Sequence, residues 1–247
     1  MAAAARSALR GHPAVCFMRP RTTVIYMTGV LSPAIAAHAD RDDIGVIVQP
    51  GTASFVRRLA ARWAVDNGAF GKPDFDEQRW FAWVSSLPTN PGPLFVVAPD
   101  VPGDAVATRR RSGPWLPQIR ELGHPAAFAA QNGCTLESTP WDDFDVLFVG
   151  GLPDAWGREW KVGANARCLV AEAVRRGKWV HMGRVNTEAR LRYAWAIGCD
   201  SVDGTFLKYG APGQNEERLI RYLDRLRQES ASPTLWPRFE PLPSTPL

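Results

Sequence analysis

Three aspartates are the residues of this chain best placed to do chemistry. Asp66, Asp100 and Asp203 each come just after a short apolar run, and such a run is typical of a buried strand. Two carboxylates that face each other across the anomeric carbon of a sugar can cleave a glycosidic bond, because one attacks to form a covalent glycosyl-enzyme while the other protonates the leaving group. The aspartates can share this chemistry only if the fold brings their strand ends together.

Polar side chains and glycines also follow the remaining apolar runs. A carboxylate and an amide suit the donor edge of a purine, glycine lets backbone groups approach a flat base because it has no Cβ, and methionine packs on an aromatic ring. On this basis the candidate base-binding residues are Asp100, Gln131, Gly150, Gly151, Leu152 and Met182. The adjacent His181 is interpreted as a hydrogen-bonded core histidine rather than a catalytic one.

Eight apolar runs, with helical patterns between most of them, are typical of an α/β protein. In a chain of 247 residues they predict a single (β/α)8 TIM-like barrel, in which the carboxyl ends of all strands meet at one mouth. An open doubly wound sheet is the alternative. The predicted strands are Val24–Met27, Ile44–Val48, Trp63–Asp66, Leu94–Ala98, Ala126–Ala130, Val146–Val149, Trp179–Met182 and Cys199–Val202. The predicted helices are Ser54–Ala61, Phe75–Val84, Asp104–Leu122 with proline breaks, Ala164–Arg176, Thr187–Ile197 and Asn215–Arg227.

The sequence predicts one domain with two appendages. Residues 23–230 would form the barrel, residues 1–22 an N-terminal extension without a secretory signal, and residues 231–247 a proline-rich tail. No run approaches the roughly 20 apolar residues that a membrane span needs. Four scattered cysteines without zinc-ligand spacing predict reduced thiols, no metal site and a cytoplasmic protein.

The charge balance is mildly basic, with a formal net charge of +4 and 25 arginines against 4 lysines. Arginine suits bidentate phosphate contacts, although codon bias in a GC-rich genome would give the same excess. The residues predicted to contact a nucleic-acid backbone are Arg184, Arg190 and Lys208 near the mouth, and Arg109, Arg110 and Arg111, whose run is also typical of a solvated helix face. Trp156 and Trp160, after the sixth predicted strand, would stack on an extruded base, fill its gap or cover the mouth.

Six short motifs occur in order between Asp66 and Asp203. They are Asp66-Asn67-Gly68-Ala69-Phe70, Ala98-Pro99-Asp100, Gln131-x-Gly133, Gly150-Gly151-Leu152, Met182-Gly183 and Gly198-x-Asp200-x-x-Asp203. Together, at predicted strand ends, they resemble the tRNA-guanine transglycosylase superfamily over roughly residues 64 to 205. The resemblance implies that Asp203 is the nucleophile and Asp66 the general acid and base, with no cofactor. The base-binding residues that it implies are Asp100, Gln131, Gly150, Gly151, Leu152, Met182 and Phe70.

The chain departs from that family in ways that bear on the substrate. The tRNA enzymes exchange guanine for a 7-deazaguanine through a covalent ribosyl-aspartate, and they carry a Cys/His zinc subdomain that this sequence cannot form. Their DSGGFQ pattern has serine and glutamine where this chain has Asn67 and Gly71, and Val101 replaces an acidic residue. These departures are closer to the compact DNA-acting branch, which includes enzymes that insert 7-deazaguanines into DNA and glycosylases that remove modified bases from phage genomes.

The predicted function is therefore a DNA base glycosylase or transglycosylase. It would act on a flipped-out, modified or guanine-like base of double-stranded DNA, in DNA modification or antiviral defence. A free 7-deazaguanine base is the candidate co-substrate if exchange, rather than water, resolves the intermediate. The alternatives are base exchange on RNA, a non-catalytic barrel that binds modified nucleic acid, and an unrelated glycosidase acting on small sugars.

Overall fold

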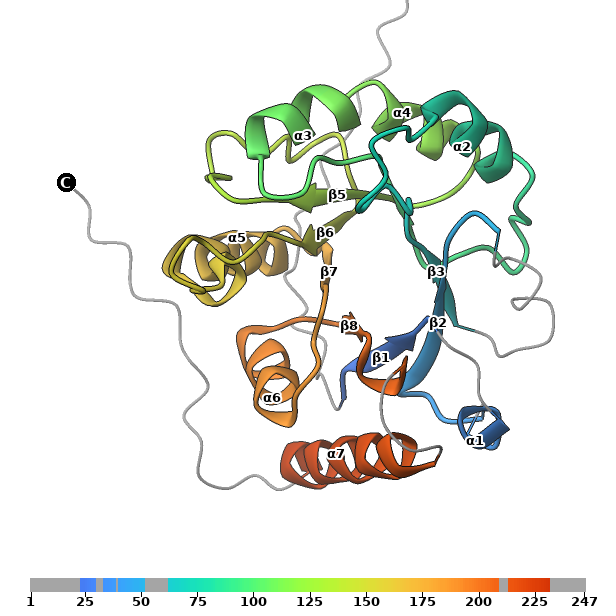
Figure 1. Cartoon of the computed structure of the whole chain (residues 1–247), viewed down its shortest axis with the longest axis vertical. Helices are drawn as coiled ribbons and strands as arrows, with labels where there is room; N and C mark the ends of the chain where they lie inside the picture. The colour runs from blue at the N-terminus through green and yellow to red at the C-terminus, as the bar shows by residue number, and fades with distance from the viewer. Residues whose placement is uncertain (1–22, 30–32, 39, 52–61, 209–212, 232–247) are drawn as a thin grey trace, which may run out of the picture.

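The chain folds as a closed barrel of eight parallel strands (Figure 1). The computed structural model describes residues 23–29, 33–38, 40–51, 62–208 and 213–231. Each strand pairs with the next along the chain, and β8 returns to pair with β1. The strands are β1 (Ile25–Thr28), β2 (Ile44–Val48), β3 (Trp63–Val65), β4 (Val96–Val97), β5 (Ala126–Ala130), β6 (Val146–Val149), β7 (Trp179–Met182) and β8 (Ser201–Gly204).

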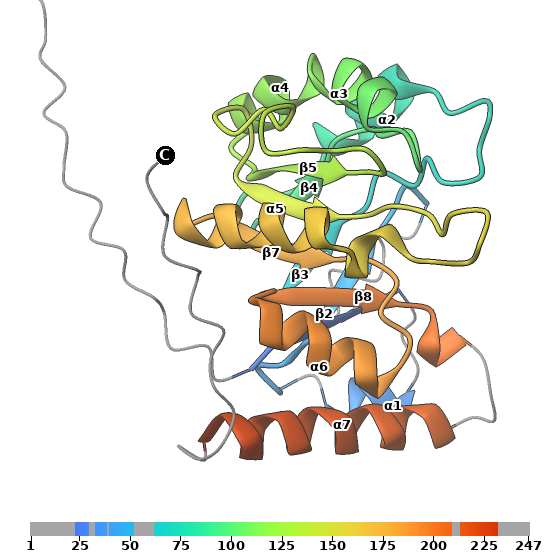
Figure 2. The same ribbon diagram turned by 90° about the vertical axis from the view of Figure 1, so that its left-hand side faces the viewer.

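Helices lie around the outside of the barrel and return the chain between strands (Figures 1 and 2). They are α1 (Pro33–Ala36), α2 (Glu77–Val84), α3 (Ala105–Ser112), α4 (Trp115–Glu121), α5 (Ala164–Arg175), α6 (Glu188–Ile197) and α7 (Gln214–Ala231), with short 3-10 turns η2 (Trp160–Val162) and η3 (Phe206–Lys208). The single α/β barrel predicted from the sequence is confirmed. The open doubly wound sheet is wrong, because pairing of β1 with β8 leaves no open edge.

Local sequence explains where the helices begin and end. The predicted helix over 104–122 is broken as expected, since Gly113 and Pro114 separate α3 from α4. α6 begins after Thr187, whose hydroxyl accepts a hydrogen bond from the Arg190 backbone N–H, and it ends at Gly198 with φ of 106°. The predicted helix Ser54–Ala61, the extension 1–22 and residues 232–247 lie outside the described residues.

Strand side chains alternate between two apolar layers. One layer packs between the strands and the helices, and the other fills the barrel interior. The interior residues are Ile25, Met27, Ala64, Phe95, Val97, Ala127, Ala129 and Val146. Because alternate residues share a face, Asp66 follows Ala64 inward and Gln131 follows Ala129. The interior layer therefore ends, at the carboxyl side of the strands, in polar side chains.

Two absences concern the described part of the chain alone. None of its helices has the length and apolar character needed to cross a membrane. Within the same residues, no group of three or more histidine, cysteine, aspartate or glutamate side chains is arranged to hold a metal ion. Cys134, Cys168 and Cys199 are free thiols.

Candidate active site

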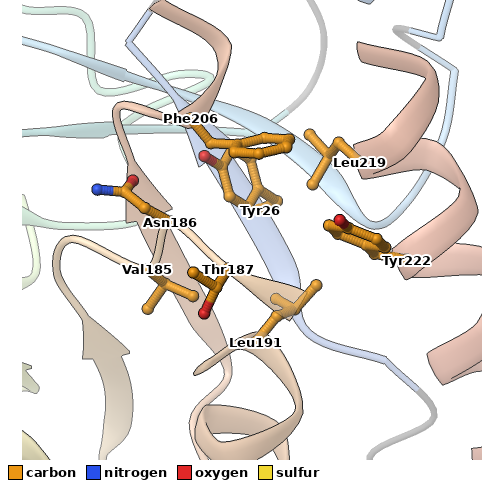
Figure 3. Close-up of a pocket in the computed structure, with 8 residues that line it drawn as sticks. All are labelled: Tyr26, Val185, Asn186, Thr187, Leu191, Phe206, Leu219 and Tyr222. Carbon is orange, nitrogen blue, oxygen red and sulfur yellow. The ribbon is translucent and has the colours of Figure 1, made fainter. Parts of the chain in front are cut away.

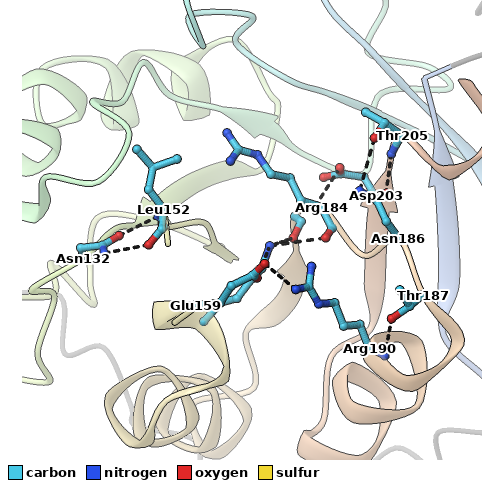
Figure 4. Close-up of polar contacts among 12 residues, drawn as sticks. Asn132, Leu152, Glu159, Arg184, Asn186, Thr187, Arg190, Asp203 and Thr205 are labelled. Carbon is cyan, nitrogen blue, oxygen red and sulfur yellow. Dashed lines mark hydrogen bonds and ion pairs between the residues drawn. The ribbon is translucent and has the colours of Figure 1, made fainter. Parts of the chain in front are cut away.

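Asp203 lies on β8 with both carboxylate oxygens hydrogen bonded. Its Oδ2 is 2.9 Å from His181 Nε2. Its Oδ1 accepts the Arg184 backbone N–H at 3.2 Å (Figure 4). The Asp203 side chain keeps about a fifth of its surface exposed, whereas His181 is fully buried. One oxygen of Asp203 is thus held firmly, and the other carries a single long hydrogen bond at a solvent-accessible position.

A chain of directed hydrogen bonds fixes the His181 tautomer. Trp179 Nε1, which can only donate, lies 2.8 Å from Ser201 Oγ, and Ser201 Oγ lies 2.8 Å from His181 Nδ1. The Asp203 carboxylate can only accept, so the neutral imidazole presents its proton to Asp203 from Nε2. Ser201 Oγ, which accepts from Trp179, then donates its own proton to Nδ1. Sequence reasoning gave His181 a core role and missed this contact, although alternation from Trp179 places its side chain inward.

Asp66 comes directly after β3 and is partly exposed. Burial, followed by the negative charges of Asp203 and Asp100, raises the pKa of Asp66 to about 7. Backbone N–H groups of Asn67 and Gly68 bond its carboxylate and oppose part of this rise. Since Asp203 acts on Asp66 through its charge, the first and last aspartates predicted from the sequence do lie at one mouth. The Asp66 carboxyl, with its pKa near 7, can therefore hold a proton at neutral pH.

Asp100 is bound into a buried amide network. Asn67 Nδ2 donates to Asp100 Oδ1 at 2.9 Å, and Gln131 Nε2 donates to Asp100 Oδ2 at 2.5 Å. Burial is the main effect that raises the pKa of Asp100, while these two amides oppose it. Asn67 also donates to the Ala98 carbonyl. The structure thus brings Asp100 and Gln131 together as expected, and it assigns a connecting role to Asn67 that the sequence did not reveal.

The glycine pair after β6 is positioned by amide side chains from β5. Gln131 Oε1 accepts the backbone N–H of Gly151 at 2.8 Å and of Gly103 at 2.9 Å. Asn132 pairs with both backbone groups of Leu152, at 2.8 and 2.9 Å (Figure 4). The Gly151 N–H is therefore used within the protein. The Leu152 carbonyl keeps one free lone pair for a ligand.

Gly150 and Gly151 allow close packing at this turn. A Cβ on Gly150 would lie 2.6 Å from Gln131 Nε2, and one on Gly151, whose φ is 89°, would lie 2.9 Å from the Trp160 ring. Both glycines are required by these contacts and, for Gly151, by the backbone conformation. Gln131 thus shapes this turn and also binds Asp100.

Met182 does not line this mouth. It is 1% exposed and packs in the outer layer between strands and helices. The neighbouring inward position is occupied by His181, whose ring stacks on Phe148 with centroids 4.7 Å apart and an interplanar angle of 30°. Phe148, rather than Met182, supplies a partly exposed ring near Asp203, because strand alternation turns residue 182 away from the interior.

A buried ion network supports the loop between β7 and α6. Lys161 is 4% exposed, donates to the Gly183 carbonyl at 2.9 Å, and lies 3.4 Å from Glu159, which also pairs with Arg190. Arg184 has a left-handed backbone, with φ of 58°. Lys161 Nζ is also 3.4 Å from the Arg184 carbonyl. This network holds the N–H of Arg184 toward Asp203.

Two side chains at the mouth form an exposed pair. The Arg184 guanidinium lies over the Phe70 ring, 4.0 Å from its centroid, and Phe70 is 57% exposed. Asn186 joins the same loop to the end of β8 by accepting the Thr205 backbone N–H at 2.7 Å. The predicted positions of Phe70 and Arg184 at the mouth therefore agree with the fold.

The other predicted phosphate-binding residues differ in their surroundings. Arg111 is committed to Glu77, at 2.6 Å, and to the Asp100 carbonyl, so it is a structural ion pair rather than a free cation. Arg109 donates to the Ser138 carbonyl, and Arg110 is exposed on α3. Lys208 ends η3, and its side chain lies outside the described part.

A small crevice lies outside the barrel wall, between β1, α6, η3 and α7 (Figure 3). Its lining residues are Tyr26, Val185, Asn186, Thr187, Leu191, Phe206, Leu219 and Tyr222. Burial first, and then the charge of Asp203, raise the pKa of Tyr26, so its hydroxyl stays protonated. The crevice is lined by none of the three aspartates, and it is separate from the mouth that holds them.

No protein-family model matches the sequence, and a search of curated proteins finds no match to it. What this site can do is therefore judged from its own residues. It combines a proton-donating Asp66, a hydrogen-bonded carboxylate at Asp203 and a fixed amide network around Asp100. Such a set suits displacement at a sugar carbon assisted by proton transfer.

Proposed function

We propose that this protein cleaves the N-glycosidic bond of a nucleobase in nucleic acid, with DNA as the favoured substrate, through a covalent sugar–Asp203 intermediate. One observation carries the proposal: two aspartates at the same mouth lie in different environments. Asp66 has a pKa raised to about 7, while Asp203 is held in place by N–H groups on both oxygens. A carboxyl that holds a proton near neutral pH beside a positioned carboxylate suits an acid and a nucleophile.

In the first step Asp203 attacks the anomeric carbon and the bond from that carbon to the base breaks. Asp66 gives its proton to the departing base, which leaves poorly as an anion. The Oδ1 atom of Asp203 is the attacking atom, because Oδ2 is held by His181 while Oδ1 has one hydrogen bond of 3.2 Å. The Arg184 N–H and His181 keep the carboxylate aimed at the sugar.

In the second step the Asp66 carboxylate takes a proton from the incoming group. Attack by water at the anomeric carbon would release Asp203 and leave an abasic site, whereas attack by a free base such as a 7-deazaguanine would complete an exchange. Asp100 and Gln131 face this mouth with lone pairs and one N–H left over for the edge of a purine. The acidic and amide groups favour a guanine-like base.

Two biological roles fit this reaction: insertion of a modified base into DNA, and removal of modified bases from invading phage genomes. Exchange on RNA is the alternative substrate. The motif order and the departures at Asn67, Gly71 and Val101 support the DNA-acting branch of the transglycosylase superfamily. The half-buried Arg184 and the exposed Arg110 are candidates for contact with phosphate.

The test is incubation of the purified protein with unmodified and hypermodified DNA, with and without free 7-deazaguanine base. Released bases and abasic sites are measured by mass spectrometry. We expect base release by the wild-type protein, none by Asp203→Ala, and severe loss in Asp66→Asn. Asp143→Asn is the matched control, because Asp143 is exposed just before the amino end of β6. Full activity in Asp203→Ala would refute the proposal.

A further inference from the structure

Large apolar side chains are exposed mainly where the chain leaves the carboxyl end of a strand. Among the described residues the exposed ones are Phe70, Val106, Leu136, Trp156 and Val162. Each lies after β3, β4, β5 or β6 and before the chain returns to the amino side of the barrel. Exposed apolar surface gathered on one face marks an interaction site. Trp156 has the largest of these side chains, and it is 83% exposed.

Trp156 is at the tip of a braced hairpin. Pro153 and Glu159 form an antiparallel bridge, and the Asp154 N–H donates to the Arg158 carbonyl at 2.9 Å. Asp154 Oδ1 accepts the backbone N–H groups of Trp156 and Arg158, each at 2.9 Å, and its Oδ2 pairs with the Arg158 guanidinium. The segment between β6 and α5 projects beyond the barrel on the side toward which β8 points (Figure 2). The indole is thus presented by a fixed support.

Both legs of the hairpin are tied to the candidate active site. The first leg begins at Leu152, which pairs with Asn132, and the second ends at Glu159, which contacts Lys161 and Arg190. Trp156 is three residues from either end of the Pro153–Glu159 bridge. The Gly157 N–H donates to the Asp154 carbonyl at 2.9 Å, so the chain reverses in a tight turn that contains Trp156. The indole, 83% exposed, therefore stands outside the packed rim.

We propose that Trp156 fills the gap left in duplex DNA when the target nucleotide is flipped into the barrel mouth. This inference rests on the proposed function. A lid would pack its indole against the rim, but the Trp156 ring is packed on almost nothing. Aromatic rings stack on bases of any sequence, and a base extruded for chemistry leaves a gap that must otherwise collapse or fill with water. A rigid indole outside the pocket suits that gap.

The first experiment needs no base release. Fluorescence anisotropy measures binding of the full-length protein to an intact duplex and to the same duplex carrying one abasic-site analogue. We expect the wild-type protein to prefer the gapped duplex by about ten-fold, within the range that base–aromatic stacking supplies. Trp156→Ala should lose this preference and Trp156→Phe should keep most of it. Glu121→Ala, exposed at the end of α4 where the chain returns to β5, should match the wild type. Equal preference in wild type and Trp156→Ala would overturn the inference.

The second experiment compares base release from duplex and from single-stranded DNA. A gap-filling residue matters only where a partner strand leaves a gap, so Trp156→Ala should lose about ten-fold in rate on duplex and keep its rate on single strands. Equal loss on both substrates would overturn gap filling and place Trp156 on the target base. If the wild type releases no base from either, the proposed function fails, while the binding preference still decides the role of Trp156.

Discussion

Replacement of His181 by leucine tests whether the hydrogen bond to Asp203 Oδ2 contributes to the reaction. Leucine fills much of the space between the Phe148 and Phe95 rings, whose centroids lie 4.7 and 5.1 Å from that of the imidazole. It removes the Nε2 donor, which is 2.9 Å from Asp203. His181→Gln keeps an N–H that can reach the same oxygen, and it serves as the conservative variant.

The expected size follows from the geometry. A hydrogen bond to a charged group contributes about 1.5–3 kcal/mol, which corresponds to roughly 10- to 150-fold in rate. Because the Asp203 side chain is 20% exposed, water replaces part of the lost bond, and we expect His181→Leu to lower the rate of base release about 30-fold. His181→Gln should lose less than about five-fold. The Ser201 hydroxyl loses its acceptor in the leucine variant, which should lower the free energy of unfolding by about 1–2 kcal/mol.

The assay is single-turnover base release, with urea unfolding measured on the same samples. The tautomer is read independently by ¹⁵N NMR of the imidazole in the free protein, where we expect the proton on Nε2. A wild-type rate in His181→Leu would refute the role of this hydrogen bond. A proton on Nδ1 would refute the hydrogen-bond direction through Ser201 and Trp179. If His181→Leu loses both activity and folding, the loss of rate comes from packing instead. If His181→Gln folds normally but is as slow as His181→Leu, the hydrogen bond is again not the cause.

Three further predictions concern protonation, backbone and ion pairing. The pKa of Asp66 is 3.8 when unperturbed and about 7 in the folded protein. The contribution of Asp66 to stability is therefore fully present below pH 3.8 and is lost as the pH rises through 7. The rate of base release by the wild type should also fall above pH 7. Asp66→Asn should therefore gain stability relative to the wild type as the pH rises across this window. The gain, measured by urea unfolding, should be at most about 4 kcal/mol and is reduced by solvent screening. A difference in stability that does not change with pH would contradict the raised pKa. Gly151→Ala should lower the free energy of unfolding by about 2–4 kcal/mol. Gly177 has a similar φ, but a Cβ there would meet open space, so Gly177→Ala should lower it by only about 1 kcal/mol. Equal losses in the two variants would rule out the Trp160 contact. Lys161→Met should lower the free energy of unfolding by about 3 kcal/mol and slow base release, because the loop that contains Arg184 loses its support. Lys72 is exposed, so Lys72→Met should change neither. Wild-type kinetics in Lys161→Met would show that the ion network does not affect the reaction.

The barrel could be predicted because its strands are short apolar runs of the kind that are buried on both faces. Ile44–Val48, Ala126–Ala130, Val146–Val149 and Trp179–Met182 have the predicted bounds. The run Leu94–Ala98 contains only two residues of regular strand, Val96–Val97, since its pairing with β3 is limited to Val65 and Val96. Ladder length depends on the partner strand, which is distant in sequence, so apolar content overestimates it. α1 and the 3-10 turns were missed because three or four residues carry no periodic signal.

Side-chain direction explains which site residues the sequence could and could not identify. Asp66, Gln131 and Asp203 follow inward-facing residues at intervals of two, and their approach to one mouth is a consequence of barrel closure. Met182 is at an outward-facing position of β7 and packs against the helices. The preceding residue, His181, is at an inward-facing position and contacts Asp203. Counting alternation from Trp179 and Ser201 would have exchanged the expectations for these two neighbours. No such rule reveals the Asn132–Leu152 pairing, which depends on loop geometry.

The chemistry of the site arises from unequal surroundings for equal groups. Asp66 and Asp203 have the same side chain and lie at the same mouth, but N–H donors on the β7–α6 loop and on His181 hold both oxygens of Asp203 in place. Burial, followed by the negative charges of Asp203 and Asp100, raises the pKa of Asp66 to about 7. Two identical side chains thus acquire different properties because the fold gives each strand end its own burial and its own neighbouring charges.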